Sequence, residues 1–145
     1  MDPNFPDEEY LLTDKVTYRF REPSRGDVIV FKPPTNNGEE FIKRIIALPG
    51  EEVSLKNSKI YINGTPLEES YLGGNVITSG GAFLGEGTTL TVPSQEYLVL
   101  GDNRPRSSDS RSWGFVQKKG ITGRAWLVYW PLKSAGVVAK VKYNL

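Results

Sequence analysis

Short apolar runs rich in Val, Ile, Tyr and Phe recur along the chain between Gly, Pro and Asn residues, and this alternation constrains the fold most. Such runs are typical of β-strands bounded by turns. No stretch shows a sustained helical period with capping residues. The sequence therefore predicts an all-β protein with strands over residues 9–14, 27–32, 39–48, 52–55, 59–62, 89–92, 96–100, 121–130 and 137–142.

The chain length and two local segments refine this expectation. With 145 residues the chain can form one domain with a real core, so we expect residues 1–145 to be a single domain. Asn63-Gly64 favours a tight hairpin turn after the strand at 59–62. Residues 73–87 contain six glycines and little charge, which indicates an irregular excursion. It either covers part of the core or forms a long mobile loop.

Composition excludes several classes of function. The chain has no histidine and no cysteine, which removes Ser-His-Asp triads, cysteine proteases, disulfide frameworks and zinc sites built on those residues. A net charge of +1 gives no bulk electrostatic case for binding nucleic acid. No apolar run approaches the roughly 20 residues that span a bilayer. We therefore expect these 145 residues to be soluble by themselves.

One loop is unusually rich in polar groups that can satisfy one another. It lies between the apolar runs at 96–100 and 113–116, and a loop built only to turn would need a few Gly, Asn or Asp residues. Such density suggests a fixed network that positions something. Its charged and hydroxyl side chains include Asp102, Arg104, Arg106, Ser107, Ser108, Asp109, Ser110 and Arg111.

A lysine in the predicted strand 39–48 has mostly apolar neighbours. Burial of Lys43 beside Phe41, Ile42 and Ile45 would lower the pKa of its amine and leave it able to accept a proton. By itself, however, an isolated strand lysine usually faces solvent. Strand alternation puts Lys43 and Arg44 on opposite faces, so only one of them can easily point inward.

Three segments in order resemble the type I signal peptidases, membrane-bound serine endopeptidases that remove signal peptides. Residues 97–116 resemble the last sequence box of that family, 40–50 resemble the box with its catalytic lysine, and 25–31 resemble the preceding strand. The resemblance covers most of residues 10–131. It implies a signal peptidase-like β-barrel core in which residues 54–89 form a reduced version of a variable insertion.

The resemblance also implies roles for individual residues. Lys43 would be the general base, and Arg44 would be left to salt bridges or the surface. Ser107 would orient the lysine amine, while Asp102, Arg104, Asp109 and Arg111 would brace the loop. An extended signal peptide would bind beside strands, with small side chains entering shallow apolar pockets. The matching substrate-binding positions are Met1, Phe5, Glu40, Phe41 and Ile42. For Phe41 and Ile42 ordinary core packing is an equally good interpretation. No cofactor and no metal are expected.

The nucleophile of the family is expected just before this chain. In the family a serine is followed by Met, one variable residue and Pro, and the chain opens Met1-Asp2-Pro3. We therefore expect the serine and a membrane anchor to precede Met1 in the full-length enzyme, and this chain to be inactive as given. The resemblance places that enzyme at the bacterial plasma membrane, with this domain on the extracytoplasmic face and secretory preproteins as partners.

Three alternatives stay open. A non-catalytic β-barrel relative could bind extended peptides without cutting them. A cytosolic self-cleaving repressor-like peptidase shares the Ser/Lys dyad, although the segments Gly-Asp-Asn-Arg and Ser-Asp-Ser-Arg disfavour it. A plain structural β-domain would not need a neutral lysine.

Overall fold

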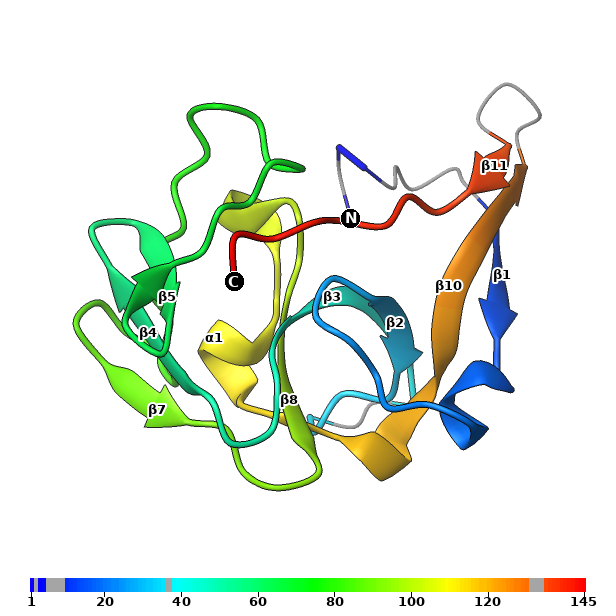
Figure 1. Cartoon of the computed structure of the whole chain (residues 1–145), viewed down its shortest axis with the longest axis horizontal. Coiled ribbons are helices and arrows are strands. Elements are labelled where there is room, and N and C mark those ends of the chain that lie inside the picture. Colours follow the sequence, from blue (N-terminus) through cyan, green and yellow to red (C-terminus); the bar gives the residue numbers. More distant parts are fainter. Residues whose placement is uncertain (2, 5–9, 36–37, 131–134) are drawn as a thin grey trace.

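The computed structural model of the chain describes residues 1, 3–4, 10–35, 38–130 and 135–145 (Figure 1). Its strands form two antiparallel sheets, and the prediction of an all-β protein is confirmed. The larger sheet has the order β1-β10-β2-β3-β8-β9, with β11 paired to β10. Its strands are β1 Tyr10–Asp14, β2 Val28–Phe31, β3 Phe41–Ala47, β8 Glu96–Leu100, β9 Val116–Gln117, β10 Ile121–Trp130 and β11 Gly136–Val137.

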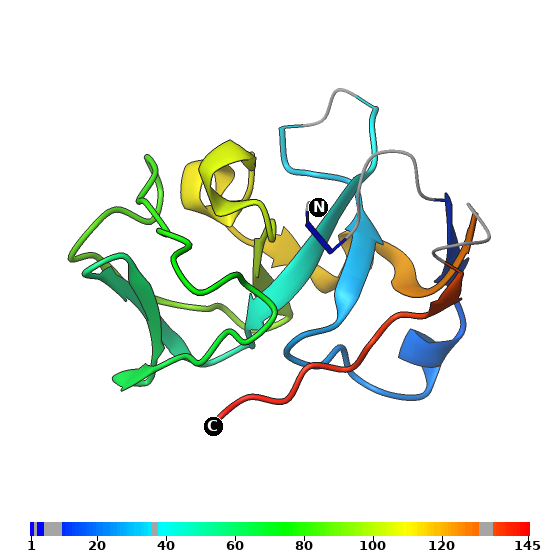
Figure 2. The ribbon, with the colours of Figure 1, turned by 90° about the horizontal axis from the view of Figure 1, so that it is seen from above.

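The smaller sheet is formed by strands that precede and follow residues 73–87. Its order is β6-β5-β4-β7, formed by Thr65–Pro66, Lys59–Ile62, Glu52–Lys56 and Thr89–Thr91. Asn63 and Gly64 both have positive φ, as a two-residue type I′ hairpin turn requires, and Ile62 pairs with Thr65 across it. Figure 2 shows this sheet at one end of the molecule and β1, β10 and β11 at the other. The boundaries 54–89 of the insertion stay a prediction.

Short helical segments connect the strands. They are the 3₁₀ turns η1 Thr17–Arg19, η2 Arg104–Arg106 and η3 Lys118–Gly120, and the four-residue helix α1 Ser110–Trp113. The Asp109 carboxylate caps α1 by accepting a hydrogen bond from the Arg111 N–H at 3.2 Å. A helix of one turn is too short to give a periodic apolar pattern, so the sequence did not predict it.

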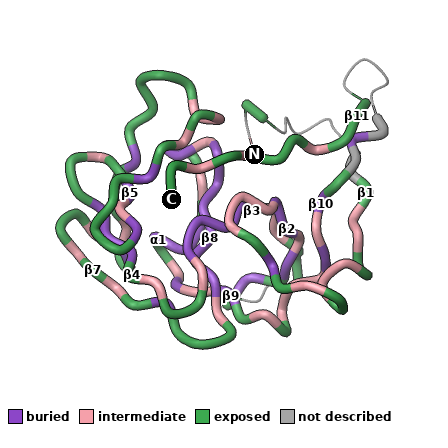
Figure 3. Tube along the Cα trace, in the orientation of Figure 1, coloured by how far each residue is buried: buried purple, intermediate pink, exposed green. Residues whose placement is uncertain are grey.

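Strand β3 is buried on both faces from Arg44 to Ala47, which leaves Arg44 the expected salt-bridge role rather than a place on the surface. Ile46 and Ala47 pack in the core beneath the smaller sheet, whereas Ile45 packs with Phe31 and Val99 in a second core. Figure 3 shows buried backbone along β8 and β2, which pair with other strands of this sheet. Neither face of β3 is therefore free for Arg44 to reach solvent, and Arg44 is 3% exposed.

The predicted strand at 137–142 is wrong beyond Val137. The C-terminal segment crosses the molecule towards the smaller sheet without a ladder (Figure 1). It is held by one backbone hydrogen bond, from the Val138 N–H to the Trp126 carbonyl, and by side chains near its end. Tyr143 packs edge-on against Tyr71, and the Asn144 amide bonds the Pro66 carbonyl and the Glu68 N–H.

Gly123 in β10 should be intolerant of any side chain because β1 lies directly against it. An added Cβ would stand 2.5 Å from the Asp14 carbonyl oxygen and 2.8 Å from Thr13 Cγ2. We expect Gly123→Ala to lower the free energy of unfolding in urea by about 1–3 kcal/mol, as overpacking does. Gly74, with nothing within 4 Å of the same position, is the control. A Gly123→Ala variant as stable as Gly74→Ala would contradict this packing.

Candidate active site

Lys43 occupies the middle of β3, opposite Ile29 of β2. Its side chain is half-buried, and the ammonium lies 5.3 Å from the centroid of the Phe41 ring. Within the described residues Nζ makes no ion pair or hydrogen bond. Burial lowers the pKa of the amine below its ordinary value of 10.5, while the nearby carboxylates of Asp109 and Asp102 partly oppose this shift. The net effect favours a neutral amine that can accept a proton.

Gly101 brings Ser107 against Lys43. A Cβ added at Gly101 would overlap Ser107 Oγ, and it would stand 2.6 Å from Ser107 Cβ and 3.5 Å from Lys43 Cδ. Both side chains therefore pack over a position where only glycine fits. Ser107 Oγ is buried and has no hydrogen-bond partner among the described residues. The predicted hydrogen bond between this hydroxyl and the lysine amine is not formed here, although both side chains pack beside Gly101.

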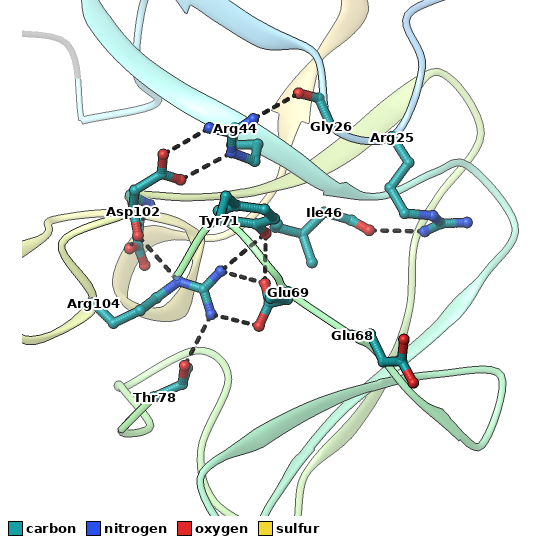
Figure 4. A network of polar contacts seen from close by, with 12 residues as sticks. Arg25, Gly26, Arg44, Ile46, Glu68, Glu69, Tyr71, Thr78, Asp102 and Arg104 are labelled. Atoms are coloured by element: carbon teal, nitrogen blue, oxygen red, sulfur yellow. Dashed lines mark hydrogen bonds and ion pairs between the residues drawn. The ribbon is translucent and has the colours of Figure 1, made fainter. Parts of the chain in front are cut away.

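Asp102 pairs with Arg44 rather than with a residue of its own loop. Arg44 Nε donates to Asp102 Oδ1 at 2.9 Å and Nη2 donates to Oδ2 at 2.7 Å, both in a buried setting. Arg44 Nη1 donates to the Gly26 carbonyl at 3.1 Å. The Tyr71 ring lies 4.2 Å from the guanidinium carbon and covers its face. This bidentate pair joins β3 to the start of the polar loop (Figure 4).

Asp109 and Arg111 form a second buried pair within the loop. Arg111 Nε and Nη2 donate to the two carboxylate oxygens of Asp109, each at 2.8 Å. Asp109 Oδ2 also accepts the Gly101 N–H at 3.1 Å, and Arg111 Nη2 donates to the Arg104 carbonyl at 2.8 Å. The pair therefore ties both ends of the loop together. Its bracing role stays a prediction.

Arg104 has a partner that the sequence did not indicate. Its side chain is fully buried, and both terminal nitrogens donate to the carboxylate of Glu69, with Nη1 to Oε2 at 3.0 Å. Nη1 also donates to Thr78 Oγ1 at 2.9 Å, and Nε donates to the Gly101 carbonyl at 3.1 Å. Figure 4 shows Glu69, Tyr71 and Thr78 around this guanidinium. The predicted network of Asp102, Arg104, Asp109 and Arg111 thus depends on residues from outside the loop.

The predicted substrate-binding residues are divided between different surroundings. Met1 and Ile42 pack together on a small apolar cluster of Val28, Ala125 and Val128. Met1 Sδ accepts the Asp102 N–H at 3.4 Å, and Asn4 Nδ2 donates to Asp102 Oδ2 at 2.8 Å. The amino end of the chain is therefore held beside the polar loop.

The remaining predicted substrate-binding residues lie elsewhere. Phe41 packs in the second core against Phe31 and Trp113, with ring centroids 6.4 and 6.5 Å away, as the core-packing interpretation expects. Glu40 is exposed and accepts a hydrogen bond from the Thr122 hydroxyl at 2.7 Å. Phe5 lies outside the described residues.

Other possible sites are limited in the part of the chain that the structure describes. No group of three or more Asp and Glu side chains there could hold a metal ion. No helix among the same residues is long and apolar enough to cross a bilayer. A cavity of about 700 Å³ lies between η1, η3 and the start of β8, and its walls do not include Lys43. This cavity is therefore no candidate for chemistry by the Lys43 amine, because the Lys43 side chain packs beside Gly101 and Ser107 instead.

Replacing Asp109 with Asn should destabilise the protein strongly. The change would leave the Arg111 guanidinium buried beside an uncharged amide, and breaking a buried pair in this way costs about 3–5 kcal/mol. Urea unfolding followed by tryptophan fluorescence would measure the loss. Glu22→Gln is a useful control because the Glu22 carboxylate is exposed and its pair with Lys118 lies at the surface. Equal and small losses in both variants would argue against bracing by Asp109.

Comparisons with known proteins show the family to which the chain is related. Residues 1–130 match the family described as signal peptidase, peptidase S26. A probable signal peptidase I-2 of Synechocystis sp. is 38% identical over 143 residues, which cover 95% of this chain and 62% of the relative. A signal peptidase I of Leptolyngbya laminosa is 40% identical, covering 92% of this chain and 66% of the relative. The chain thus spans slightly less than two thirds of these relatives.

A solved structure gives the same result. The crystal structure of a signal peptidase I from Enterococcus faecalis V583 superposes with a TM-score of 0.61 at 39% identity, covering 72% of this chain and 97% of that chain. Lys43, Ser107 and the buried arginine–carboxylate pairs occupy the part of the sequence that the family match covers. The chain belongs to the signal peptidase S26 family.

Proposed function

We propose that this chain is the catalytic core of a serine endopeptidase that removes signal peptides from secretory preproteins, with Lys43 as its general base. The observation that carries the proposal is the half-buried side chain of Lys43. Burial lowers the pKa of its amine, and no ion pair among the described residues holds the amine in its charged form. A base that works near neutral pH must be unprotonated for part of the time. The lowered pKa of Lys43 moves its amine towards this requirement, and the chain has no histidine that could serve instead.

The nucleophile in this proposal is the hydroxyl of a serine joined to Met1. Met1 Sδ accepts the Asp102 N–H, and Asp102 follows directly after the glycine that packs against Lys43. With the Met1 side chain held at the polar loop, the proposal requires that a residue attached to the Met1 amino group reach Lys43. Its hydroxyl could then give its proton to Lys43 Nζ.

The proposed reaction has two steps. Lys43 takes the serine proton while the serine oxygen attacks the scissile carbonyl, and the resulting ammonium then gives that proton to the departing amine. In the second step Lys43 takes a proton from water, which attacks the acyl-enzyme ester, and the serine leaves with the proton returned. Ser107 Oγ would accept a hydrogen bond from the amine and orient it. This hydroxyl is buried beside Gly101 and has no partner among the described residues.

The proposed substrate is an extended peptide with small residues next to the cleaved bond. The apolar cluster that contains Met1 and Ile42 would form a shallow pocket that larger side chains cannot enter. Glu40 lies at the exposed start of β3, where a strand-like peptide could add main-chain hydrogen bonds. The full-length enzyme would work at the extracytoplasmic face of the bacterial plasma membrane, held there by an anchor that precedes the serine.

A cleavage assay tests the proposal directly. The chain is extended by one serine before Met1 and incubated with a peptide that carries an Ala-x-Ala signal site. We expect cleavage after the second Ala, and loss of about 100-fold or more when Lys43 is replaced by Ala, as removal of a general base commonly causes. Lys56→Ala is the matched control, because Lys56 is an exposed lysine on β4.

The pH dependence gives a second, independent readout. Because the amine must be neutral, the rate should rise with pH and level off above the pKa of Lys43, with a midpoint below 10.5. A serine-extended chain that binds the peptide without cutting it would favour the alternative of a non-catalytic peptide-binding relative. Cleavage that persists in Lys43→Ala would reject the proposed base.

A further inference from the structure

We infer that residues 69–79, between β6 and β7, position the lysine base, and that Glu69 is the main positioning residue. This inference deepens the proposed function and rests on it. The segment overlaps the excursion 73–87, for which the sequence suggested either a cover for the core or a mobile loop. Nothing in the family match assigns these residues a part in the reaction.

Each of the three buried arginines behind Lys43 contacts a residue of this segment. Arg44 is covered by the Tyr71 ring, and Arg104 is held by the Glu69 carboxylate and the Thr78 hydroxyl. The third, Arg111, donates from Nη1 to the Ser79 carbonyl at 3.0 Å. The same arginines hold Asp102, Gly101 and Asp109 on their other side. The segment therefore supports the whole polar loop from behind.

Arg104 provides the shortest route from the segment to the base. Its side chain is fully buried, and its five N–H groups have partners in Glu69, Thr78, Tyr71 and the Gly101 carbonyl. The Tyr71 contact is the weakest, at 3.4 Å from Nη2 to the hydroxyl. Figure 4 shows that the Glu69 carboxylate faces the guanidinium. A guanidinium with every donor engaged has one orientation, so its Nε is fixed on the Gly101 carbonyl.

The position of Gly101 affects the position of Lys43, because the two residues lie in direct packing contact. The peptide groups on its two sides are fixed, because its N–H donates to Asp109 and its carbonyl accepts from Arg104. The side chains of Ser107 and Lys43 both occupy the space next to Gly101 that a side chain there would need. A shift of the Gly101 carbonyl would therefore loosen the packing against the Lys43 side chain and make it more accessible to water.

Loss of the Glu69 charge should cause such a shift. A buried guanidinium without its carboxylate is strongly unfavourable, so Arg104 would turn towards water and release Gly101. Water would then reach Lys43 and weaken the burial that lowers its pKa. A simple electrostatic effect has the opposite sign, because removing a negative charge makes an ammonium less favourable and lowers the pKa further. The sign of the change thus separates positioning from charge.

The test compares Glu69→Gln with Glu68→Gln. Both variants lose one carboxylate at neighbouring positions, but Glu68 is exposed and its side chain points away from Arg104 (Figure 4). The pKa of the Lys43 amine is measured by NMR titration of its ε-methylene in the 145-residue chain, and cleavage against pH is measured in the serine-extended chain. We expect Glu69→Gln to move both midpoints up towards 10.5 and to lower kcat by up to about 100-fold at neutral pH, as misplaced catalytic groups do. Glu68→Gln should change neither.

Thr78→Val keeps the charge of Glu69 and removes only one hydrogen bond to Arg104. We expect it to move the Lys43 pKa in the same direction by a smaller amount, and it decides the matter if Glu69→Gln does not fold. A Lys43 pKa that is unchanged or lower in folded Glu69→Gln, or unchanged in Thr78→Val when only that variant folds, overturns the inference. If the Lys43 pKa responds as expected but the serine-extended chain never cuts, the proposed function fails while the positioning link stands.

Discussion

Buried pairing of arginine with carboxylate is the interaction on which this structure depends. Three such pairs each include a residue of the polar loop: Arg44–Asp102, Arg104–Glu69 and Asp109–Arg111. Removing two charges from water is costly, and such pairs often contribute little net stability compared with apolar packing. What they supply is geometry, since a bidentate guanidinium accepts only one relative orientation of its partner.

These pairs also bear on how Lys43 can lie near two aspartates without an ion pair to either of them or to any other described residue. The carboxylates of Asp102 and Asp109 both act on the pKa of Lys43, and an unpaired carboxylate at either position would favour the charged amine. Their oxygens are occupied instead by Arg44 and Asn4 at Asp102, and by Arg111 and the Gly101 N–H at Asp109. Both carboxylates still raise the pKa of Lys43, but burial has the larger effect and the net shift is downward.

The sequence predicts the regular part of this fold well because its signals are local. Strands β5, β8 and β10 have the predicted bounds, and the Asn63-Gly64 turn lies where its dipeptide indicates. The strand expected at 137–142 is wrong because its apolar alternation is used for side-chain packing over the surface instead of a ladder. Alternation records which side chains are buried, and it does not record whether a neighbouring strand is present.

The candidate site also has a part that the local sequence predicts and a part that it does not. Lys43, Ser107 and the loop residues are recognisable in sequence, yet the partners of the arginines lie 58 residues away at Asp102 for Arg44 and 35 residues away at Glu69 for Arg104. Nothing in local spacing chooses Glu69 over the adjacent Glu68, since both follow the same hairpin. The choice is made by the path of the excursion, which brings Gly81 so close to the Arg111 carbonyl that a side chain would overlap it.

That close approach has a consequence for how the site is assembled. The polar loop beside Lys43 is held by residues from the amino end, from β3 and from residues 69–79, so none of these segments can form the site alone. Residues 69–79 must settle against the loop before Arg104 has a carboxylate, and until then the guanidinium remains in water. If Lys43 is the base, as proposed, its lowered pKa depends on a burial that these long-range contacts help to build, which would couple the chemistry of one amine to the packing around it.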